Sequence, residues 1–497
     1  MEPSPHNPFR TRRDFLRQAS CAAVGTWALT STIRDLRLIN AALGQTSLPG
    51  YKALVCLFLS GGNDANNLIV PTDSTYADYS SIRGNLAVPQ SALLPLQTGT
   101  GGPNYQDADG HTLGFHPACQ KFQTLFAEDK LAQVMNVGTL VRPITRAQYL
   151  TNATGTRPPQ LFSHSDQVTQ WQTSIPDQPP TTGWGGRIAD LLNANANPTG
   201  KISMSVSLNG ANTFEVGNQI SQYHVSSTGA VTLSGNLMTG TGARLKALKD
   251  LIALPHTNLQ RSEYAKVIDR AIDTGDLLNT SIAATAMSTD SPPGTWVWNT
   301  PFPVTGLGNQ MKMIARIIQA RGPSGFDMSR QIFFCSVGGY DTHTAQVSAV
   351  VNGVTVNDPA NTTGAHYRLL NEISECMFAF QRAMEQIGVA NEVTTFTASD
   401  FSRTFPTNSQ GSDHGWGSHH LVMGGAVNGG QTYGKLPTFA LNGPDDTGTG
   451  RWIPTLAVDQ YAATIAKWFG LDDSKLSSVF PNLSRFSTSN LGFMGAA

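Results

Sequence analysis

Four short, mainly apolar stretches constrain the fold of this chain more than any other feature. They cover residues 51–59, 131–137, 331–337 and 393–397. Such runs are typical of strands buried on both faces, as in a parallel sheet covered by helices. Helical periodicity marks the segments 244–286, 307–321, 366–388 and 458–469. The sequence therefore predicts an α/β protein with buried strands.

Three of the apolar stretches are followed by an aspartate. Asp64 lies just past the first stretch, Asp341 follows the third, and Asp400 lies at the end of the fourth. The carboxyl ends of parallel strands meet at one edge of a sheet, where α/β proteins bind their ligands. We therefore expect the three carboxylates to lie close together.

Histidines accompany two of these aspartates. His343 lies two residues after Asp341, and the loop after Asp400 contains Asp413, His414 and His419. Carboxylate oxygens and imidazole nitrogens without thiolates suit zinc, manganese, magnesium or calcium. We predict a divalent metal site of one or two ions, with these candidate ligands: Asp64, Asp341, His343, Asp400, Asp413, His414 and His419.

Several of these residues also have a simpler interpretation. Asp64 could cap the helix that follows it. His414, His419 and His420 could be loop residues with ordinary hydrogen bonds. These alternatives stay open at the level of the sequence.

A second group of residues suggests a catalytic role. Ser163 begins a helical segment, where it could be an ordinary N-cap or a nucleophile whose developing anion is held by helix amides. Arg403 could hold two oxygens of a phosphate or sulfate group. With the neighbouring His164, these residues are the candidate catalytic set.

The N-terminal segment is predicted to be separate from the fold. Residues 11–17 fit the twin-arginine export pattern, and residues 19–30 are weakly apolar but too short and polar to span a membrane. We predict a signal peptide at 1–45, recognised by the twin-arginine export machinery, and localisation in the periplasm or outside the cell. The remaining residues, 46–497, are predicted to form one domain with a hairpin and helical excursion at about 190–300.

Composition excludes several classes of protein. Charged residues make up 13 % of the chain and the net charge is -1, so no nucleic-acid partner is indicated. The cysteines outside the signal segment have no metal-type spacing, and we predict buried thiols at Cys56, Cys119, Cys335 and Cys376. No GxGxxG follows a predicted strand, which argues against a dinucleotide-dependent redox enzyme.

The chain resembles an uncharacterised family of twin-arginine-exported bacterial proteins within the alkaline phosphatase/sulfatase superfamily. The resemblance covers nearly the whole chain. It rests on the export signal and on FLSGGNDANN (58–67), GFHPA (114–118), FSHSDQ (162–167), GWGGR (183–187), GGYDTH (338–343), TASDFSRT (397–404), SDHGWGSHH (412–420) and VFPNL (479–483).

This resemblance implies an alkaline-phosphatase-like three-layer sandwich, in which helices flank a mostly parallel sheet and ligands lie at the strand ends. It implies metal-ligand roles for Asp64, Asp341 with His343, Asp400, and His414 or His419, and a nucleophile role for Ser163. The chain departs from the superfamily pattern at Phe401, where a histidine is usual. The Cys-x-Pro-x-Arg context of sulfatases is also absent around Ser163.

Two functions follow as hypotheses. The first is an exported metal-dependent hydrolase of phosphate or sulfate esters, whose substrate is an anionic ester such as a decorated polysaccharide or lipid. The second is a non-catalytic surface or biogenesis protein that keeps the scaffold with a degraded site, an interpretation that Phe401 favours. The first predicts bound divalent metal, whereas the second does not require it.

Overall fold

A large mixed sheet organises the protein. The computed structural model describes residues 48–230, 242–255, 258–285, 299–351, 354–357 and 364–495. The sheet has ten strands in the order β14-β5-β13-β12-β1-β9-β6-β7-β8, and β15 pairs with β5. Its strands are β1 Lys52–Leu59, β5 Leu131–Gly138, β6 Ser205–Ser207, β7 Tyr223–Ser226, β8 Gly229–Ala230, β9 Arg330–Val337, β12 Val393–Ser399, β13 Ser418–Met423, β14 Thr432–Tyr433 and β15 Leu456–Ala457.

Most of these strands run in the same direction. Strand β1 pairs in parallel with β9 and β12, and β6 pairs in parallel with both β9 and β7. Strand β13 is antiparallel to both β12 and β5, so β5 runs in the same direction as β1. The predicted α/β class is confirmed, with β13 and β8 as the reversed strands. The carboxyl ends of β1, β5, β9 and β12 therefore share one edge with the start of β13.

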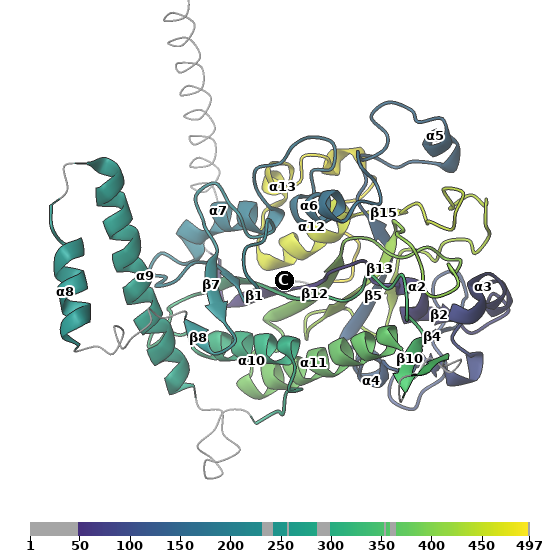
Figure 1. The fold of residues 1–497 in the computed structure, drawn as a ribbon, viewed down its shortest axis with the longest axis horizontal. Coiled ribbons are helices and arrows are strands. Elements are labelled where there is room, and N and C mark those ends of the chain that lie inside the picture. Colours follow the sequence, from purple (N-terminus) through teal and green to yellow (C-terminus); the bar gives the residue numbers. More distant parts are fainter. Residues whose placement is uncertain are drawn as a thin grey trace, which may run out of the picture.

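Helices cover both faces of the sheet (Figure 1). One face carries α4 (Gln120–Ala127), α10 (Gly306–Gln319) and α11 (Ala365–Ile387). The other carries α6 (His164–Thr173), α7 (Trp184–Ala196), α12 (Val458–Phe469) and α13 (Leu476–Val479). The coarse prediction of a central sheet flanked by helices is therefore confirmed. The more specific prediction, an alkaline-phosphatase-like sandwich, rests on the family resemblance and is not confirmed by the strand order.

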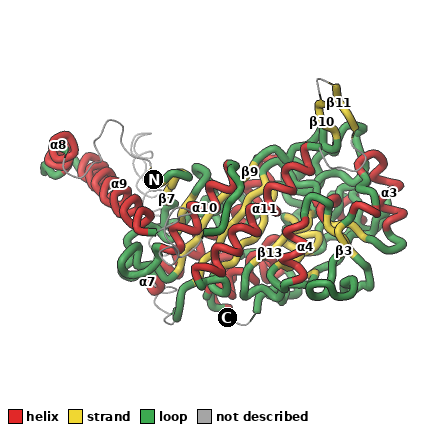
Figure 2. The backbone as a smooth tube through the Cα atoms, turned by 90° about the horizontal axis from the view of Figure 1, so that it is seen from below, coloured by secondary structure: helices red, strands yellow, loops and turns green. Residues whose placement is uncertain are grey.

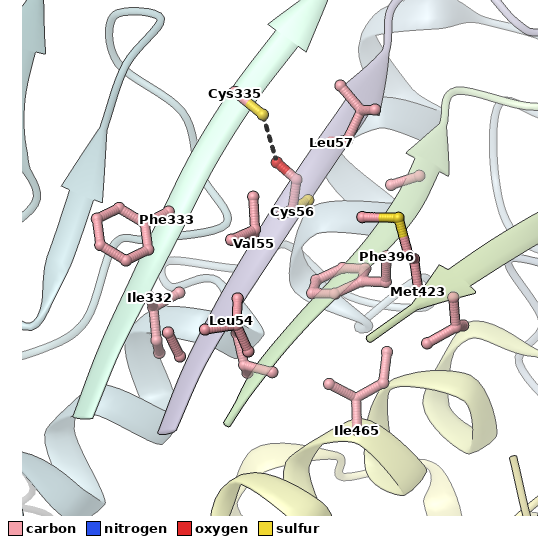
Figure 3. Close-up of a cluster of buried hydrophobic side chains, with 14 of the residues drawn as sticks. Leu54, Val55, Cys56, Leu57, Ile332, Phe333, Cys335, Phe396, Met423 and Ile465 are labelled. Carbon is pink, nitrogen blue, oxygen red and sulfur yellow. Dashed lines mark hydrogen bonds between the residues drawn. The ribbon is translucent and has the colours of Figure 1, made fainter. Parts of the chain in front are cut away.

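The central strands are buried because their residues are apolar on both faces. Figure 3 shows Leu54 and Cys56 of β1 between Phe333 of β9 and Phe396 of β12, with Ile465 of α12 below them. The Cys335 thiol of β9 donates to the Cys56 carbonyl oxygen at 3.6 Å. All four cysteines of the described residues are free and buried, which confirms the prediction of buried thiols.

The remaining elements lie around this body. They are α2 Ala65–Leu68, α3 Tyr76–Arg83, α5 Arg146–Leu150, α8 Ala243–Ile252, α9 Leu259–Ala284, a three-stranded sheet of β2 Ile69–Pro71, β4 Leu113–Phe115 and β3 Leu94–Pro95, and a hairpin of β10 Ser348–Val351 and β11 Val354–Asn357. Helices α8 and α9 project at one end of the molecule, and the β10–β11 hairpin projects at the other (Figure 2). The helical period predicted across 244–286 is thus divided between two helices. Pro255 lies between them, and proline cannot donate to the helical ladder.

The predicted signal peptide at 1–45 lies outside the described residues. The predicted division into a signal and one domain with an excursion stays a prediction. None of the helices in the described parts of the chain combines the length and apolarity needed to cross a membrane.

Candidate metal centre

Three segments bring imidazole and carboxylate groups to the edge where the parallel strands end. The loop after β9 contributes Asp341 and His343, and the first residue of α6 is His164. The segment before β13 contributes His414. Because β13 is antiparallel to β12, the start of β13 lies at the same sheet edge as the end of β9. His414, which precedes β13, therefore meets Asp341, which follows β9.

Three of these side chains, His164, His414 and Asp341, converge on one point, and His343 lies beside them. The Nε2 atom of His414 lies 3.1 Å from Nε2 of His164 and 3.0 Å from Nε2 of His343. The Oδ1 atom of Asp341 lies 3.5, 3.1 and 3.3 Å from the Nε2 atoms of His164, His343 and His414, respectively. These side chains are 24–45 % exposed, so the cluster opens to solvent on one side.

The Nδ1 atom of each histidine ring lies within hydrogen-bond distance of an acceptor oxygen. Nδ1 of His164 lies 2.7 Å from Oδ2 of Asp400, and Nδ1 of His343 lies 2.9 Å from Oδ1 of Asp413. Nδ1 of His414 lies 2.8 Å from the carbonyl oxygen of Phe162. Carboxylates and carbonyls accept hydrogen bonds, so the ring proton of each neutral histidine belongs on Nδ1. The Nε2 atoms then present lone pairs to one another.

A cation would relieve the repulsion between these lone pairs. Burial lowers the pKa of His414, and the charges of His164 and Arg403 lower it further, which disfavours a proton on its Nε2 atom. A metal ion could be shared by three of these groups. Tetrahedral ligands at about 2.0–2.1 Å from zinc are separated by roughly 3.3 Å, and the contacts among His164, His414 and Asp341, at 3.1–3.5 Å, have that spacing. These three side chains could therefore hold one divalent ion, with His343 beside it.

Two carboxylates lie behind the histidines, as is usual for histidines that bind a metal ion. A histidine ligand commonly donates its second N–H to a carboxylate or carbonyl, which fixes the tautomer and the ring orientation. Asp400 and Asp413 occupy that position here, although both were predicted as ligands themselves. Gly61 N donates to Asp400 Oδ1 at 3.0 Å, so the backbone after β1 holds this carboxylate toward His164.

The floor of the cluster is apolar. The Phe401 ring is 2 % exposed, and its centroid lies 4.8 Å from the ring centroids of both His164 and His414. A Cβ atom on Gly62, whose φ is +84°, would lie 2.5 Å from the Phe401 ring. The glycine after β1 therefore allows Phe401 to pack directly beneath two of the imidazoles.

Arg403 balances the charge of the cluster from the protein side. Its Nη1 atom lies 2.6 Å from Asp341 Oδ1 and also donates to the carbonyl oxygen of Gly61, while Nη2 donates to the carbonyl oxygen of Ser412. Burial alone would raise the pKa of Asp341, but the hydrogen bond and charge of Arg403 outweigh it and the net pKa is lowered. The Arg403 side chain is fully buried, so it faces Asp341 rather than an open substrate position.

Two of the predicted ligands lie apart from the cluster. Asp64 is fully buried and forms an ion pair with Arg83, and Gln346 also donates to it. Burial would raise the pKa of Asp64, but the charge of Arg83 reverses this and lowers it. His419 is buried in β13, where its Nδ1 accepts the Asn136 N–H at 3.0 Å, and burial lowers its pKa to about 4.

The predicted nucleophile lies next to the cluster. Ser163 is the N-cap residue of α6, one residue before His164, and its side chain makes no capping hydrogen bond. Its Oγ atom instead lies 2.5 Å from Oδ2 of Asp166, an acceptor that could take the hydroxyl proton. The catalytic role of Ser163 stays a prediction.

Two features of the centre were not predicted from the sequence. His164 was assigned to catalysis rather than to ion binding, although its place at the start of a helix after a strand and loop was visible. The carbonyl oxygen of Phe162 was not considered, because every residue carries a carbonyl and the sequence gives no sign of which one will face a histidine.

The fold and the centre define a mixed α/β protein with a single candidate metal cluster among the described residues. The chain belongs to the family described as "Protein of unknown function (DUF1501)", which matches residues 51–484. No curated protein matches the chain.

The family match corrects the resemblance drawn from the sequence. The matched family is uncharacterised, and nothing in the match links it to the alkaline phosphatase/sulfatase superfamily or to twin-arginine export. The assignment to that superfamily is therefore wrong as an identification. Many of the motifs on which the resemblance rested are strand ends and glycine turns. These features recur in many α/β proteins that bind ligands at the same edge of the sheet.

Proposed function

We propose that this protein is a metal-dependent hydrolase of anionic esters, with one divalent ion held by His164, His414 and Asp341 and with His343 beside it. The observation that carries the proposal is that the Nε2 atoms of His164 and His414 and the Oδ1 atom of Asp341 lie within 3.1–3.5 Å of one another. The Nδ1 atom of each of the two rings lies beside an acceptor. Histidine nitrogens with one carboxylate suit zinc, manganese or iron better than calcium, which prefers oxygen ligands.

A divalent ion at this position would supply a Lewis acid that polarises an ester oxygen and lowers the pKa of water. The chain's own residues have separate tasks. Asp400 and Asp413 hold His164 and His343 in one tautomer, and Arg403 keeps Asp341 ionised. The overall reaction consumes one water, breaks the bond between the phosphorus or sulfur atom and the alcohol oxygen, and returns the alcohol and the free oxyanion.

The preference for phosphate or sulfate esters is supported by the start of α6. The first amides of a helix have no carbonyl partner within the helix and attract anions. Helix α6 begins at His164, a residue of the cluster itself, so an anionic group bound to the ion would lie beside these amides. Ser163 and Asp166 lie in the same turn and are the candidate nucleophile and its proton acceptor.

Ester turnover tests this proposal. The purified protein is incubated with zinc, manganese or iron(II) and with 4-nitrophenyl phosphate, 4-nitrophenyl sulfate and a phosphodiester. We expect turnover that a chelator removes and the matching metal restores. Absence of turnover with every metal, in a protein that binds metal, would favour the non-catalytic surface or biogenesis function instead.

We also propose export from the cytoplasm, and the motif that supports it is Arg12-Arg13. Substitution of both arginines by lysine should keep the precursor in the cytoplasm of the producing cell, whereas the unchanged chain should reach the periplasm or medium. Equal distribution of the two chains would contradict this part of the proposal.

A further inference from the structure

A cavity lies beside the candidate metal centre, and none of the candidate metal ligands lines it. Its volume is about 520 Å³, within the range of about 300–1,000 Å³ that is usual for ligand sites. The connection between α5 and α6 forms most of its wall, including Asn152, Arg157, Gln160 and Phe162, and Tyr149 of α5 adds to it. The same connection runs directly into Ser163 and His164.

Phe162 belongs to both sites. It lines the cavity, and its carbonyl oxygen accepts from Nδ1 of His414. Its φ of +72° is a conformation that bulky residues rarely adopt. The conformation is held because Phe162 N donates to Gln167 Oε1 at 2.7 Å while the carbonyl is engaged by His414. A ligand in the cavity would therefore lie next to a group bound at the metal centre.

The cavity walls combine apolar surface with a cation, Arg157, which also donates a hydrogen bond to Asn152 Oδ1. The guanidinium carbon of Arg157 lies 4.8 Å from the centroid of the Tyr149 ring, and Leu161 with two prolines adds apolar surface. None of the ion pairs found among the described residues includes Arg157. The other charged wall residue, Asp177, is already neutralised by Arg485 at 2.8 Å. The cavity therefore carries one uncompensated positive charge.

We propose that this cavity binds an acidic sugar ring of the substrate, so that the ester attached to the same or the next sugar reaches the metal centre. The inference rests on the proposed function, because it names the class of ester as one carried by an acidic polysaccharide. The C–H face of a sugar would pack on Leu161 and the prolines. Its hydroxyls would accept from the side-chain NH2 group of Asn152 and hydrogen-bond to the amide of Gln160, and its carboxylate or sulfate would pair with Arg157.

Binding measured without turnover tests this inference. The probe is a chondroitin 6-sulfate tetrasaccharide, titrated by calorimetry against protein held in chelator so that no ester is cleaved. We expect Arg157→Ala to weaken binding at least about tenfold, because a hydrogen bond to a charged group is lost. Arg157→Lys should restore part of the affinity, and Arg244→Ala on the exposed start of α8 should leave it unchanged.

The uncharged tetrasaccharide chitotetraose separates charge recognition from general sugar binding, and we expect it to bind at least tenfold more weakly than the acidic probe. Equal affinity of the wild type and Arg157→Ala for the acidic probe would overturn the inference, as would equal affinity of the wild type for both sugars. Failure of the proposed function is distinguishable. In that case the acidic probe binds as expected but no ester is turned over with metal present.

Discussion

The Nε2 atoms of His343 and His414 lie 3.0 Å apart, although the Nδ1 atom of each ring faces a hydrogen-bond acceptor. Two neutral imidazoles of this tautomer have no proton to share between them. The same relationship joins His414 to His164 at 3.1 Å. A divalent ion in the proposed site would accept these lone pairs, which is why the proposed function depends on this arrangement.

The carboxylates behind the histidines should control metal affinity. Asp413→Asn keeps the size of the side chain but removes the charge that holds His343. Burial would raise the pKa of this carboxyl, but the hydrogen bonds of Asn408 and His343 outweigh burial and lower the pKa. We expect metal affinity to fall about 10–100-fold, as is usual when such a partner is lost. Competition with a coloured chelator measures the change. Asp107→Asn, in a partly exposed turn, is the control. An unchanged metal affinity in Asp413→Asn would show that the carboxylate does not act through His343.

Asp64 distinguishes the sequence-based ligand set from the one that the structure brings together. Asp64→Asn leaves the fully buried Arg83 without its partner, and such a loss typically costs about 3–5 kcal/mol of stability. We expect a lower free energy of unfolding in urea, whereas the metal content of the folded variant should stay that of the wild type. A folded Asp64→Asn protein that has lost its metal would restore Asp64 as a ligand.

Ser163 tests whether the ester is attacked by a side chain or by water. If Ser163 is the nucleophile, Ser163→Ala should lower kcat roughly a hundredfold or more and abolish a trapped covalent enzyme ester. The neighbouring Ser165→Ala is the matched control, because its hydroxyl also lies within 3.3 Å of Asp166. Unchanged kcat in Ser163→Ala, with metal content intact, would assign the attack to water.

Asp459 should make stability depend on pH. Burial raises its pKa to about 7, and its Oδ1 atom has no hydrogen-bond partner among the described residues. Between pH 4 and pH 7 the unfolded chain therefore releases a proton that the folded chain keeps, so this carboxyl destabilises the fold increasingly as pH rises. The loss reaches at most about 4 kcal/mol above pH 7. In urea unfolding, Asp459→Asn should gain stability relative to the wild type between pH 4.5 and pH 8. A difference that does not change with pH would contradict this.

The fold class could be predicted from the sequence because the central strands are apolar on both faces. Residues 51–59, 331–337 and 393–397 become β1, β9 and β12, which lie side by side in the sheet. The reversed strand β13 could not be predicted from such a pattern. It contains His419 and His420, whose burial is decided by packing against other strands and α12.

The candidate site was predictable only in part. Asp341, His343 and His414 were identified because strand ends converge, but the same rule also selected Asp64, which the neighbouring Arg83 neutralises. The difference lies in a long-range contact between α2 and α3 that strand patterns do not contain. Asp400 and Asp413 were identified as residues of the centre, but whether a carboxylate meets an ion or the back of a histidine depends on side-chain geometry. That geometry is not encoded in the spacing of the sequence.

Metal content is the most direct test of the central claim. The folded protein is purified from cells supplied with zinc, manganese and iron, and metal per chain is measured by elemental analysis. We predict about one divalent ion per chain in the wild type, loss of that ion in both His164→Ala and His414→Ala, and full retention in His224→Ala, whose histidine is exposed on β7. Folded wild-type protein without metal, or variants with unchanged metal content, would contradict the account.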